Sequence, residues 1–196
     1  MLTGNNNIKK LLCLGDSLTY GYGVKRADCW VTLTAKKTGI ELVNCGISGD
    51  TSCGMLARFQ TLAAEHSPDA LFVMGGSNDI IYSKTDSIAR SCIAAIVQQA
   101  QAMGIKPILG IPPRMLYENI SDNWSAIADF KELRGIFDEY SRWLRQFAEV
   151  FAIPTVDFSE IFYTDSERGL SPDGLHPDKE GHIRMAELLI KKLGEK

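Results

Sequence analysis

The sequence predicts an α/β fold built on one five-stranded parallel sheet with helices on both faces, and three observations support this prediction. Five short apolar runs alternate with longer segments of helical periodicity along the 196 residues. A helical segment follows each run, which is the order that produces parallel strands joined by crossover helices. Hydrophobic residues form 45% of the chain, enough for one core of ordinary size. We therefore expect a single domain over residues 1–196.

The predicted elements alternate regularly from the N-terminus onward. Strands are expected where short apolar runs occur, at residues 10–14, 41–45, 70–74, 107–111 and 155–158. Helices are expected in the amphipathic segments that follow, several of which begin at Asp, at residues 28–38, 52–66, 86–103, 129–150 and 178–193. The fourth helix is expected to bury one apolar face, formed by Phe130, Leu133, Phe137, Tyr140 and Leu144.

Charge and hydropathy exclude several classes of partner. The formal charge of -3 and the scattered Lys and Arg residues provide no basic patch for a nucleic acid. No segment approaches the roughly 20 apolar residues needed to span a bilayer. The polar stretch 1–10 is followed by a short apolar run at 11–14, too short for the central region of a signal peptide. We therefore expect a soluble cytoplasmic protein without a transmembrane segment.

Cysteine usage predicts neither a disulfide framework nor a zinc site. The cysteines are odd in number, dispersed along the chain and without CxxC spacing, a pattern that suits a reducing cytoplasm. They are Cys13, Cys29, Cys45, Cys53 and Cys92. We predict no metal and no other cofactor.

Glycine-rich and polar segments follow the predicted strands. In an open parallel sheet, ligands bind beyond the carboxyl ends of the strands, so these segments are the first place to look for a functional site. The first three strands lead into residues 15–18, 46–50 and 75–79, and the fifth is followed by residues 173–177. All four segments are expected at one edge of the sheet.

Ser17, Asp173 and His176 are the residue types of a serine-hydrolase triad. A serine hydroxyl becomes an effective nucleophile when a histidine removes its proton and a carboxylate orients that histidine. Asp173 and His176 can supply both groups from one loop. The other two histidines, His66 and His182, fall within predicted helices and have structural explanations there. We therefore predict Ser17 as nucleophile, His176 as base and Asp173 as the orienting acid.

Two more residues offer hydrogen-bond donors for the oxyanion of a tetrahedral intermediate. Gly49 presents a backbone N–H without a side chain to block the approach, and Asn78 presents a side-chain amide. Together with the backbone N–H of Ser17 they would supply three donors. Asp16, in contrast, is predicted to be a structural residue that hydrogen-bonds within its turn.

Four sequence blocks resemble the GDSL or SGNH hydrolase family, which is named after its Ser, Gly, Asn and His residues. The blocks are Gly-Asp-Ser-Leu-Thr at 15–19, Asn-x-Gly-x-x-Gly-Asp-Thr at 44–51, Gly-x-Asn-Asp at 76–79 and Asp-Gly-Leu-His-Pro at 173–177. They occur in the family's order and span nearly the whole chain. The resemblance implies a flavodoxin-like three-layer α/β/α sandwich. It also implies the roles already given for Ser17, Gly49, Asn78, Asp173 and His176.

The same resemblance implies a serine hydrolase that cleaves carboxylic esters or thioesters of small acyl substrates through an acyl-enzyme. The compact chain is most similar to bacterial acylhydrolases with thioesterase, arylesterase or lysophospholipase activity. Sugar O-acetylesterases share the same blocks, so the substrate stays open. The long segment 112–125 after the fourth strand contains Met115 and Leu116, which we expect to bind the acyl group.

Other functions compete with this prediction. A metal-dependent phosphoesterase would draw its ligands from Asp16, Asn78, Asp79, Asp173 and His176. Two-metal sites usually recruit several histidines, however, and this chain has one at a strand end. A non-catalytic flavodoxin-like module would hold a phosphate at helix N-termini, but the glycine-rich turn 15–23 lacks the lysine of a P-loop. An α/β-hydrolase is disfavoured because the chain has no Gly-x-Ser-x-Gly elbow.

Overall fold

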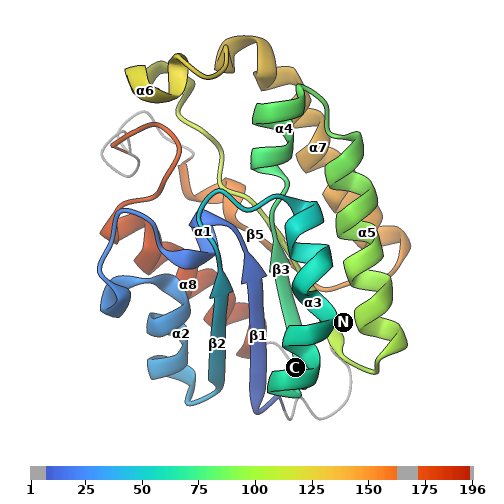
Figure 1. Cartoon of the computed structure of the whole chain (residues 1–196). Helices are drawn as coiled ribbons and strands as arrows, with labels where there is room; N and C mark the ends of the chain where they lie inside the picture. The colour runs from blue at the N-terminus through green and yellow to red at the C-terminus, as the bar shows by residue number, and fades with distance from the viewer. Residues whose placement is uncertain (1–7, 163–171, 195–196) are drawn as a thin grey trace.

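Five parallel strands form one sheet in the order β2-β1-β3-β4-β5 (Figure 1). Every neighbouring pair of strands runs parallel, which confirms the predicted α/β class. The crossover after β1 leads to β2 on one side and the crossover after β3 leads to β4 on the other, which creates a switch point between the carboxyl ends of β1 and β3. The strands are β1 (Lys10–Gly15), β2 (Glu41–Gly46), β3 (Ala70–Met74), β4 (Lys106–Ile111) and β5 (Thr155–Asp157).

Helices cover both faces of the sheet and complete three layers (Figure 1). Two helices pack against each other on one face, α2 (Trp30–Thr38) and α8 (Lys179–Gly194). Three helices cover the other face, α3 (Ser52–His66), α5 (Ser87–Ala102) and α7 (Phe130–Val150). All five predicted helices are therefore present, and the observed ends lie within two residues of the predicted ones.

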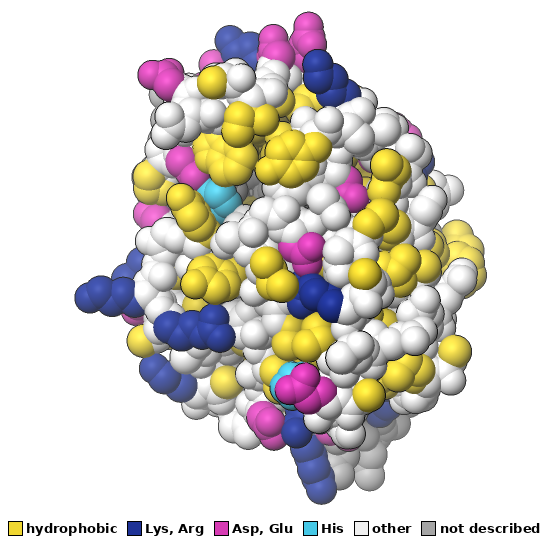
Figure 2. Space-filling view, in the orientation of Figure 1, with side chains coloured by type: hydrophobic (Ala, Val, Ile, Leu, Met, Phe, Trp, Pro, Cys, Tyr) yellow, Lys and Arg dark blue, Asp and Glu magenta, His cyan; other side chains and the backbone are white. Residues whose placement is uncertain are grey.

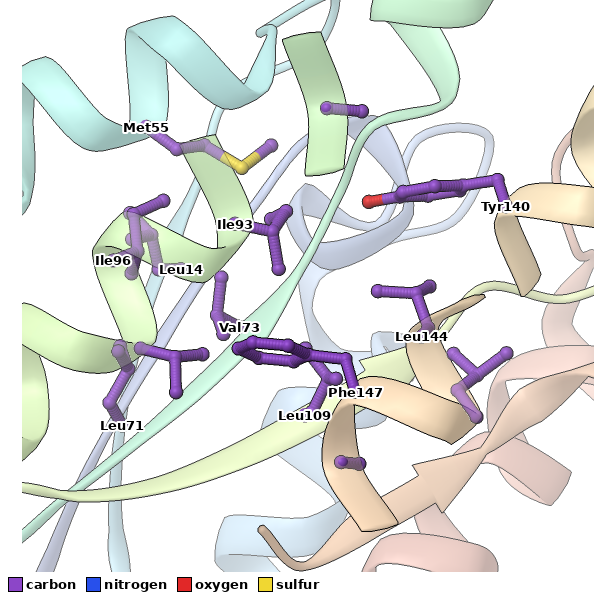
Figure 3. Close-up of a cluster of buried hydrophobic side chains, with 14 of the residues drawn as sticks. Leu14, Met55, Leu71, Val73, Ile93, Ile96, Leu109, Tyr140, Leu144 and Phe147 are labelled. Atoms are coloured by element: carbon purple, nitrogen blue, oxygen red, sulfur yellow. The ribbon is translucent and has the colours of Figure 1, made fainter. Parts of the chain in front are cut away.

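Strand side chains alternate between two hydrophobic cores. In β1, Leu12 and Leu14 contribute to the core beneath α3, α5 and α7, part of which is drawn in Figure 3. Leu11 and Cys13 point to the opposite core, which α2 and α8 cover. Because both faces of β1 are buried, its sequence is a continuous apolar run instead of an alternating one.

Three short helices were not predicted from the sequence. They lie above the carboxyl ends of the strands in Figure 1 and are α1 (Ser17–Tyr20), α4 (Ser77–Ser83) and α6 (Asp122–Ser125). Elements this short carry too few residues for a helical pattern of apolar side chains. The described residues also form three 3₁₀ helices, η1 (Arg26–Asp28), η2 (Tyr117–Asn119) and η3 (Phe158–Phe162). The last of these ends β5 one residue before its predicted end.

The computed structural model describes residues 8–162 and 172–194. Segments 1–7, 163–171 and 195–196 of the predicted domain, including most of the polar N-terminal stretch, lie outside the described residues. Within the described ranges, no helix combines the length and apolar character that a membrane span requires.

Tyr140 on α7 is hydrogen-bonded to the end of β3. Its side chain is buried, and its hydroxyl donates a 3.0 Å hydrogen bond to the carbonyl oxygen of Gly75. Gly76 follows with a φ of 102°, a left-handed conformation that favours glycine, and α4 begins at the next residue. The bond therefore fixes the backbone just before Asn78, one of the predicted site residues.

Replacing Tyr140 with Phe removes this hydroxyl and keeps the ring. We expect the free energy of unfolding in urea to fall by about 1–2 kcal/mol, because a buried donor and acceptor lose their hydrogen bond. Tyr82→Phe is a matched control, since Tyr82 is 57% exposed, and it is expected to change stability by less than about 0.5 kcal/mol. Equal losses in the two variants would contradict this role for Tyr140.

Candidate active site

Ser17 is the first residue of α1 and follows β1 after a single turn residue, Asp16. The Asp16 side chain caps the helix, because its Oδ1 accepts a 2.9 Å hydrogen bond from the Leu18 N–H. The Leu18 carbonyl in turn accepts a 2.8 Å hydrogen bond from the indole of Trp30. These contacts hold the buried Ser17 side chain beyond the carboxyl end of the sheet.

The structure brings Ser17, His176 and Asp173 into one continuous chain of hydrogen bonds. The Oγ of Ser17 lies 2.9 Å from Nε2 of His176, and Nδ1 of His176 lies 2.7 Å from Oδ2 of Asp173. The second carboxylate oxygen, Oδ1, accepts the backbone N–H groups of Leu175 and His176 at 2.9 and 2.8 Å. Asp173 therefore fixes both the turn and the orientation of the imidazole.

The Asp173 carboxyl is held in its charged form. Partial burial raises its pKa, but the hydrogen bonds from the His176 ring and from two backbone N–H groups outweigh this effect and lower the pKa to about 2. The carboxylate consequently keeps its negative charge at neutral pH. That charge favours the Nδ1–H tautomer of His176 and leaves Nε2 free to accept a proton from Ser17.

Two aromatic rings flank the imidazole of His176. The ring centroid of Tyr22 lies 4.5 Å away and that of Trp124, in α6, lies 6.0 Å away. Figure 2 shows hydrophobic side chains gathered around a histidine at this edge of the molecule. Neither ring was predicted from the sequence, since neither belongs to one of the four blocks and nothing in their spacing from His176 indicates contact.

Asn78 lies in the first turn of α4 with its amide nitrogen oriented by the backbone. One N–H of its amide donates a 2.9 Å hydrogen bond to the Asp50 carbonyl, and the side chain is buried. An amide carries two N–H groups, so the second remains for a ligand. The N–H of Ser17 has no partner inside α1, because the first N–H groups of a helix lack intrahelical acceptors.

Gly49 lies in the loop after β2, directly before Asp50. It is exposed, has a φ of 80° and does not line the cavity next to Ser17. Within the described part of the chain, its N–H donates no hydrogen bond to the protein. The hydrogen bond from Asn78 to Asp50 joins this loop to the rest of the site.

Arg58 and Asp79 hold the loops around the site in place through hydrogen bonds, and neither was predicted to do so. Arg58, on α3, donates to Oδ2 of Asp50 at 2.9 Å and to the carbonyl of Gly15, at the end of β1, at 3.0 Å. The two oxygens of Asp79 accept the N–H and the hydroxyl of Ser52 at 2.9 and 2.7 Å. Arg58 lies outside the four blocks, and its helical position gave no signal of this contact.

Two cavities meet beside the nucleophile. A small cavity of about 30 Å³ is lined by Ser17, Asn78, Trp124 and His176, among others. A larger one of about 290 Å³ lies toward α7 and shares with it the residues Ser77, Pro113 and Met115. Leu116 lines neither cavity and packs against the core beneath α2 and α8. Of the two residues expected to bind the acyl group, only Met115 therefore borders the site.

Two of the carboxylates that a metal-dependent phosphoesterase would use, those of Asp79 and Asp173, already have both oxygens hydrogen-bonded to protein groups. Both oxygens of Asp79 bind Ser52, and both oxygens of Asp173 bind the turn that carries His176. Among residues 8–162 and 172–194, no group of three or more His, Cys, Asp or Glu side chains has an arrangement suited to a metal ion.

Asp16 has a second property besides capping α1. It is 1% exposed and lines the small cavity, and its Oδ2 has no hydrogen-bond partner in the described structure. Burial raises its pKa to about 6, although the hydrogen bond from Leu18 and the charge of His176 act in the opposite direction. His182, on α8, shows the converse effect, because burial lowers its pKa to about 4.

These two groups give opposite pH dependences of stability. The stabilising effect of Asp16 is complete below about pH 4 and is lost as the pH rises through about 6, because its folded pKa is above the ordinary 3.8. For His182 the folded pKa is below the ordinary 6.5, so its effect is complete above that pH and is lost toward pH 4. Between these limits the two trends offset each other.

Asp16→Asn keeps an acceptor for the Leu18 N–H and removes one of the two trends. We expect its free energy of unfolding, measured in urea at about pH 4.5 and 6.5, to rise more steeply with pH than that of the wild type. The difference between about 6 and the ordinary 3.8 corresponds to at most about 3 kcal/mol. Asp122→Asn, at an exposed position on α6, is the control. Parallel pH dependences in wild type and Asp16→Asn would refute the assignment.

Comparisons with known proteins identify the family of the chain. The model of the GDSL-like lipase/acylhydrolase family matches residues 13–184. The chain is 27% identical over 187 residues to Thioesterase 1/protease 1/lysophospholipase L1 of Escherichia coli (strain K12), covering 93% of this chain and 82% of the relative. It is 34% identical over 114 residues to Esterase TesA of Pseudomonas aeruginosa, where the match covers 56% of this chain and 57% of the relative.

A solved structure shows the same fold. The native aryl esterase of M. smegmatis superposes with a TM-score of 0.81 at 18% sequence identity, covering 94% of this chain and 98% of that one. The likeness supports the predicted α/β/α sandwich. Because the family model covers most of the sequence, this chain belongs to the GDSL-like lipase/acylhydrolase family.

Proposed function

We propose that this protein is a serine hydrolase that cleaves carboxylic ester or thioester bonds of small acyl substrates. The observation that carries the proposal is the hydrogen-bonded chain from Ser17 Oγ through the His176 ring to Asp173, with distances of 2.9 and 2.7 Å. Membership in the GDSL-like family supports ester hydrolysis as the reaction class. The three side chains already lie within hydrogen-bonding distance of one another, so little rearrangement of them precedes the chemistry.

The first step is attack of the Ser17 hydroxyl on the carbonyl carbon of the substrate. As the new C–O bond forms, neutral His176 accepts the hydroxyl proton at Nε2 and becomes an imidazolium. The carboxylate of Asp173 stabilises that positive charge through the hydrogen bond to Nδ1. The carbonyl π electrons move to oxygen and produce a tetrahedral oxyanion.

Three donors would stabilise the oxyanion in this mechanism: the N–H groups of Ser17 and Gly49 and the second amide N–H of Asn78. Each donor removed typically raises the barrier by roughly 3 kcal/mol. Arg58 acts as a positioning residue, because its hydrogen bonds to Gly15 and Asp50 connect the β1 end to the loop that carries Gly49.

The intermediate then collapses and His176 returns its proton to the leaving alkoxide or thiolate. The leaving group departs as an alcohol or thiol, and the acyl group remains on Ser17 as an ester. In the second half of the reaction His176 takes a proton from water, which attacks the acyl carbon. Release of the carboxylic acid and return of the proton to Ser17 complete the cycle.

The two cavities support a short acyl group next to Ser17 and a bulkier, partly polar group beyond Met115. The small cavity has little free volume, whereas the larger one is lined by both aromatic and charged residues, including Tyr117, Phe137, Asp138 and Arg142. The lining of the larger cavity therefore favours a substrate with polar groups at some distance from the scissile bond. Specificity among esters and thioesters follows from the shape of these cavities.

A covalent trap tests the nucleophile without knowledge of the natural substrate. We expect a fluorophosphonate to add once to the wild type at Ser17, as located by mass spectrometry, and to abolish hydrolysis of p-nitrophenyl acetate. Ser17→Ala should lose both reactions, with a fall in kcat of about 10⁶-fold at most, as for other triad serines. Ser91→Ala, an exposed serine on α5, should behave as the wild type. Labelling at another serine would overturn the proposal.

Truncation of Met115 tests the division between the two cavities. Met115→Ala joins the small cavity to the larger one, so we expect kcat/KM for p-nitrophenyl octanoate to rise relative to that for acetate. The shift should be about 10-fold, the lower end of what one methylene group contributes in a hydrophobic pocket. Leu116→Ala is the matched control, because Leu116 lines neither cavity. An unchanged chain-length profile in Met115→Ala would count against an acyl-binding role.

A further inference from the structure

Two cysteine side chains on different helices lie against each other, outside the candidate active site. Cys53 is in the first turn of α3 and Cys92 is in α5, and their Sγ atoms are 2.8 Å apart. All five cysteines of the chain are free thiols in this structure. The gap between these two sulfurs is about 0.8 Å longer than a disulfide bond of about 2.05 Å.

The packing of α3 against α5 holds this pair in place. The two helices lie side by side (Figure 1) and share one hydrophobic core, to which Met55 and Ile93 contribute (Figure 3). A second contact between them joins Gln60 to Gln99 at 3.3 Å. The spacing from Cys53 to Gln60 along α3 equals the spacing from Cys92 to Gln99 along α5. The two helices therefore run in the same direction and in register. The approach of the two sulfurs is therefore a property of the packed core.

The two thiols differ in their access to solvent. Cys53 is exposed, whereas Cys92 is 8% exposed. A dissolved oxidant therefore reaches Cys53 first, and Cys92 is in position to attack the oxidised sulfur of Cys53. An accessible cysteine next to a second cysteine that resolves it is the arrangement found in reversible thiol switches.

We propose that Cys53 and Cys92 form a reversible disulfide site that small-molecule disulfides oxidise. The Cys53 thiolate attacks one sulfur of glutathione disulfide, so that a mixed disulfide forms on Cys53 and one glutathione thiolate leaves. The sulfur of Cys92 then attacks Sγ of Cys53 and releases the second glutathione thiolate. The two protons lost by the protein thiols go to the two glutathione thiolates, and the protein is oxidised by two electrons while the oxidant is reduced by two.

The reaction is slow, because Cys53 is mainly a neutral thiol at physiological pH. The hydrogen bond with Cys92 raises its pKa most, burial and the charge of Asp79 add to the effect, and the pKa reaches about 11. Exchange needs the thiolate, so a low thiolate fraction slows the first attack. Oxidation is therefore expected over hours of exposure to an oxidising medium.

The bond would fasten the N-terminal turn of α3 to α5. That turn also contains Ser52, which is bound by Asp79 of α4, and Asp79 is adjacent to Asn78. Oxidation consequently cross-links the layer of helices beneath the candidate oxyanion site without altering a residue of the triad. The cross-link restricts the unfolded chain more than the folded one and so raises the melting temperature.

The test is to incubate reduced protein with glutathione disulfide overnight and then determine intact mass and a non-reducing peptide map. We expect the wild type to lose two hydrogens, to yield one cross-linked peptide pair containing Cys53 and Cys92, and to recover its original mass in dithiothreitol. Its melting temperature should rise by roughly 5–10 °C on oxidation.

Three single variants make the outcome specific. Cys92→Ser removes the resolving thiol, so Cys53 should retain one glutathione, whereas Cys53→Ser should form no cross-link. Cys45→Ser, on β2, keeps both thiols and should cross-link as the wild type does. The proposal is overturned if the wild type accumulates glutathione on Cys53 without the internal bond, or if Cys45 takes part in the cross-link.

Discussion

The pairing of β1 with β2 on one side and with β3 on the other positions every part of the candidate site that precedes β4. Gly15, the last residue of β1, lies opposite Gly46 of β2 and Met74 of β3, so the three strands end at the same level. The nucleophile, the Gly49 loop and the turn that carries Asn78 consequently leave the sheet side by side. A shift of one residue in either pairing would exchange the two cores and misplace these loops together.

Two carboxyl groups close to His176 have opposite electrostatic environments. Both oxygens of Asp173 accept hydrogen bonds, and these lower its pKa to about 2 despite partial burial. Asp16 is fully buried, one of its oxygens has no hydrogen-bond partner among residues 8–162 and 172–194, and burial raises its pKa to about 6. Hydrogen bonding to the charged form thus keeps Asp173 ionised throughout the mildly acidic range, whereas Asp16 takes up a proton as the pH falls below about 6.

Much of the fold was predictable because its strands and long helices have strong local signals. Residues 70–74 and 52–66 were predicted with the observed ends, since an uninterrupted apolar run and a regular helical pattern mark them. The short helices α1 and α4 were missed, because they depend on contacts such as the Asp16 cap and the hydrogen bond from Tyr140 to Gly75. Single-residue effects of this kind leave no periodic pattern in the sequence.

The residues of the candidate site likewise fall into those with a local sequence signal and those without one. Ser17, Asn78, Asp173 and His176 were identified from their blocks, and the structure brings them together. Tyr22, Trp124 and Arg58 could not be identified, because their contacts depend on how separate elements pack. The proximity of Cys53 and Cys92 is a further example, since it depends on the register of α3 against α5. Local chemistry is thus visible in the sequence, whereas contacts across the core require the fold.

The candidate nucleophile and base are separated by 159 residues although their side chains touch. A ribosome synthesises Ser17 well before His176, and α8, which packs against α2, follows directly after the base. A nascent or prematurely terminated chain therefore has a serine without its base. In the proposed mechanism, ester hydrolysis therefore requires a chain that has been synthesised at least as far as His176 and has folded.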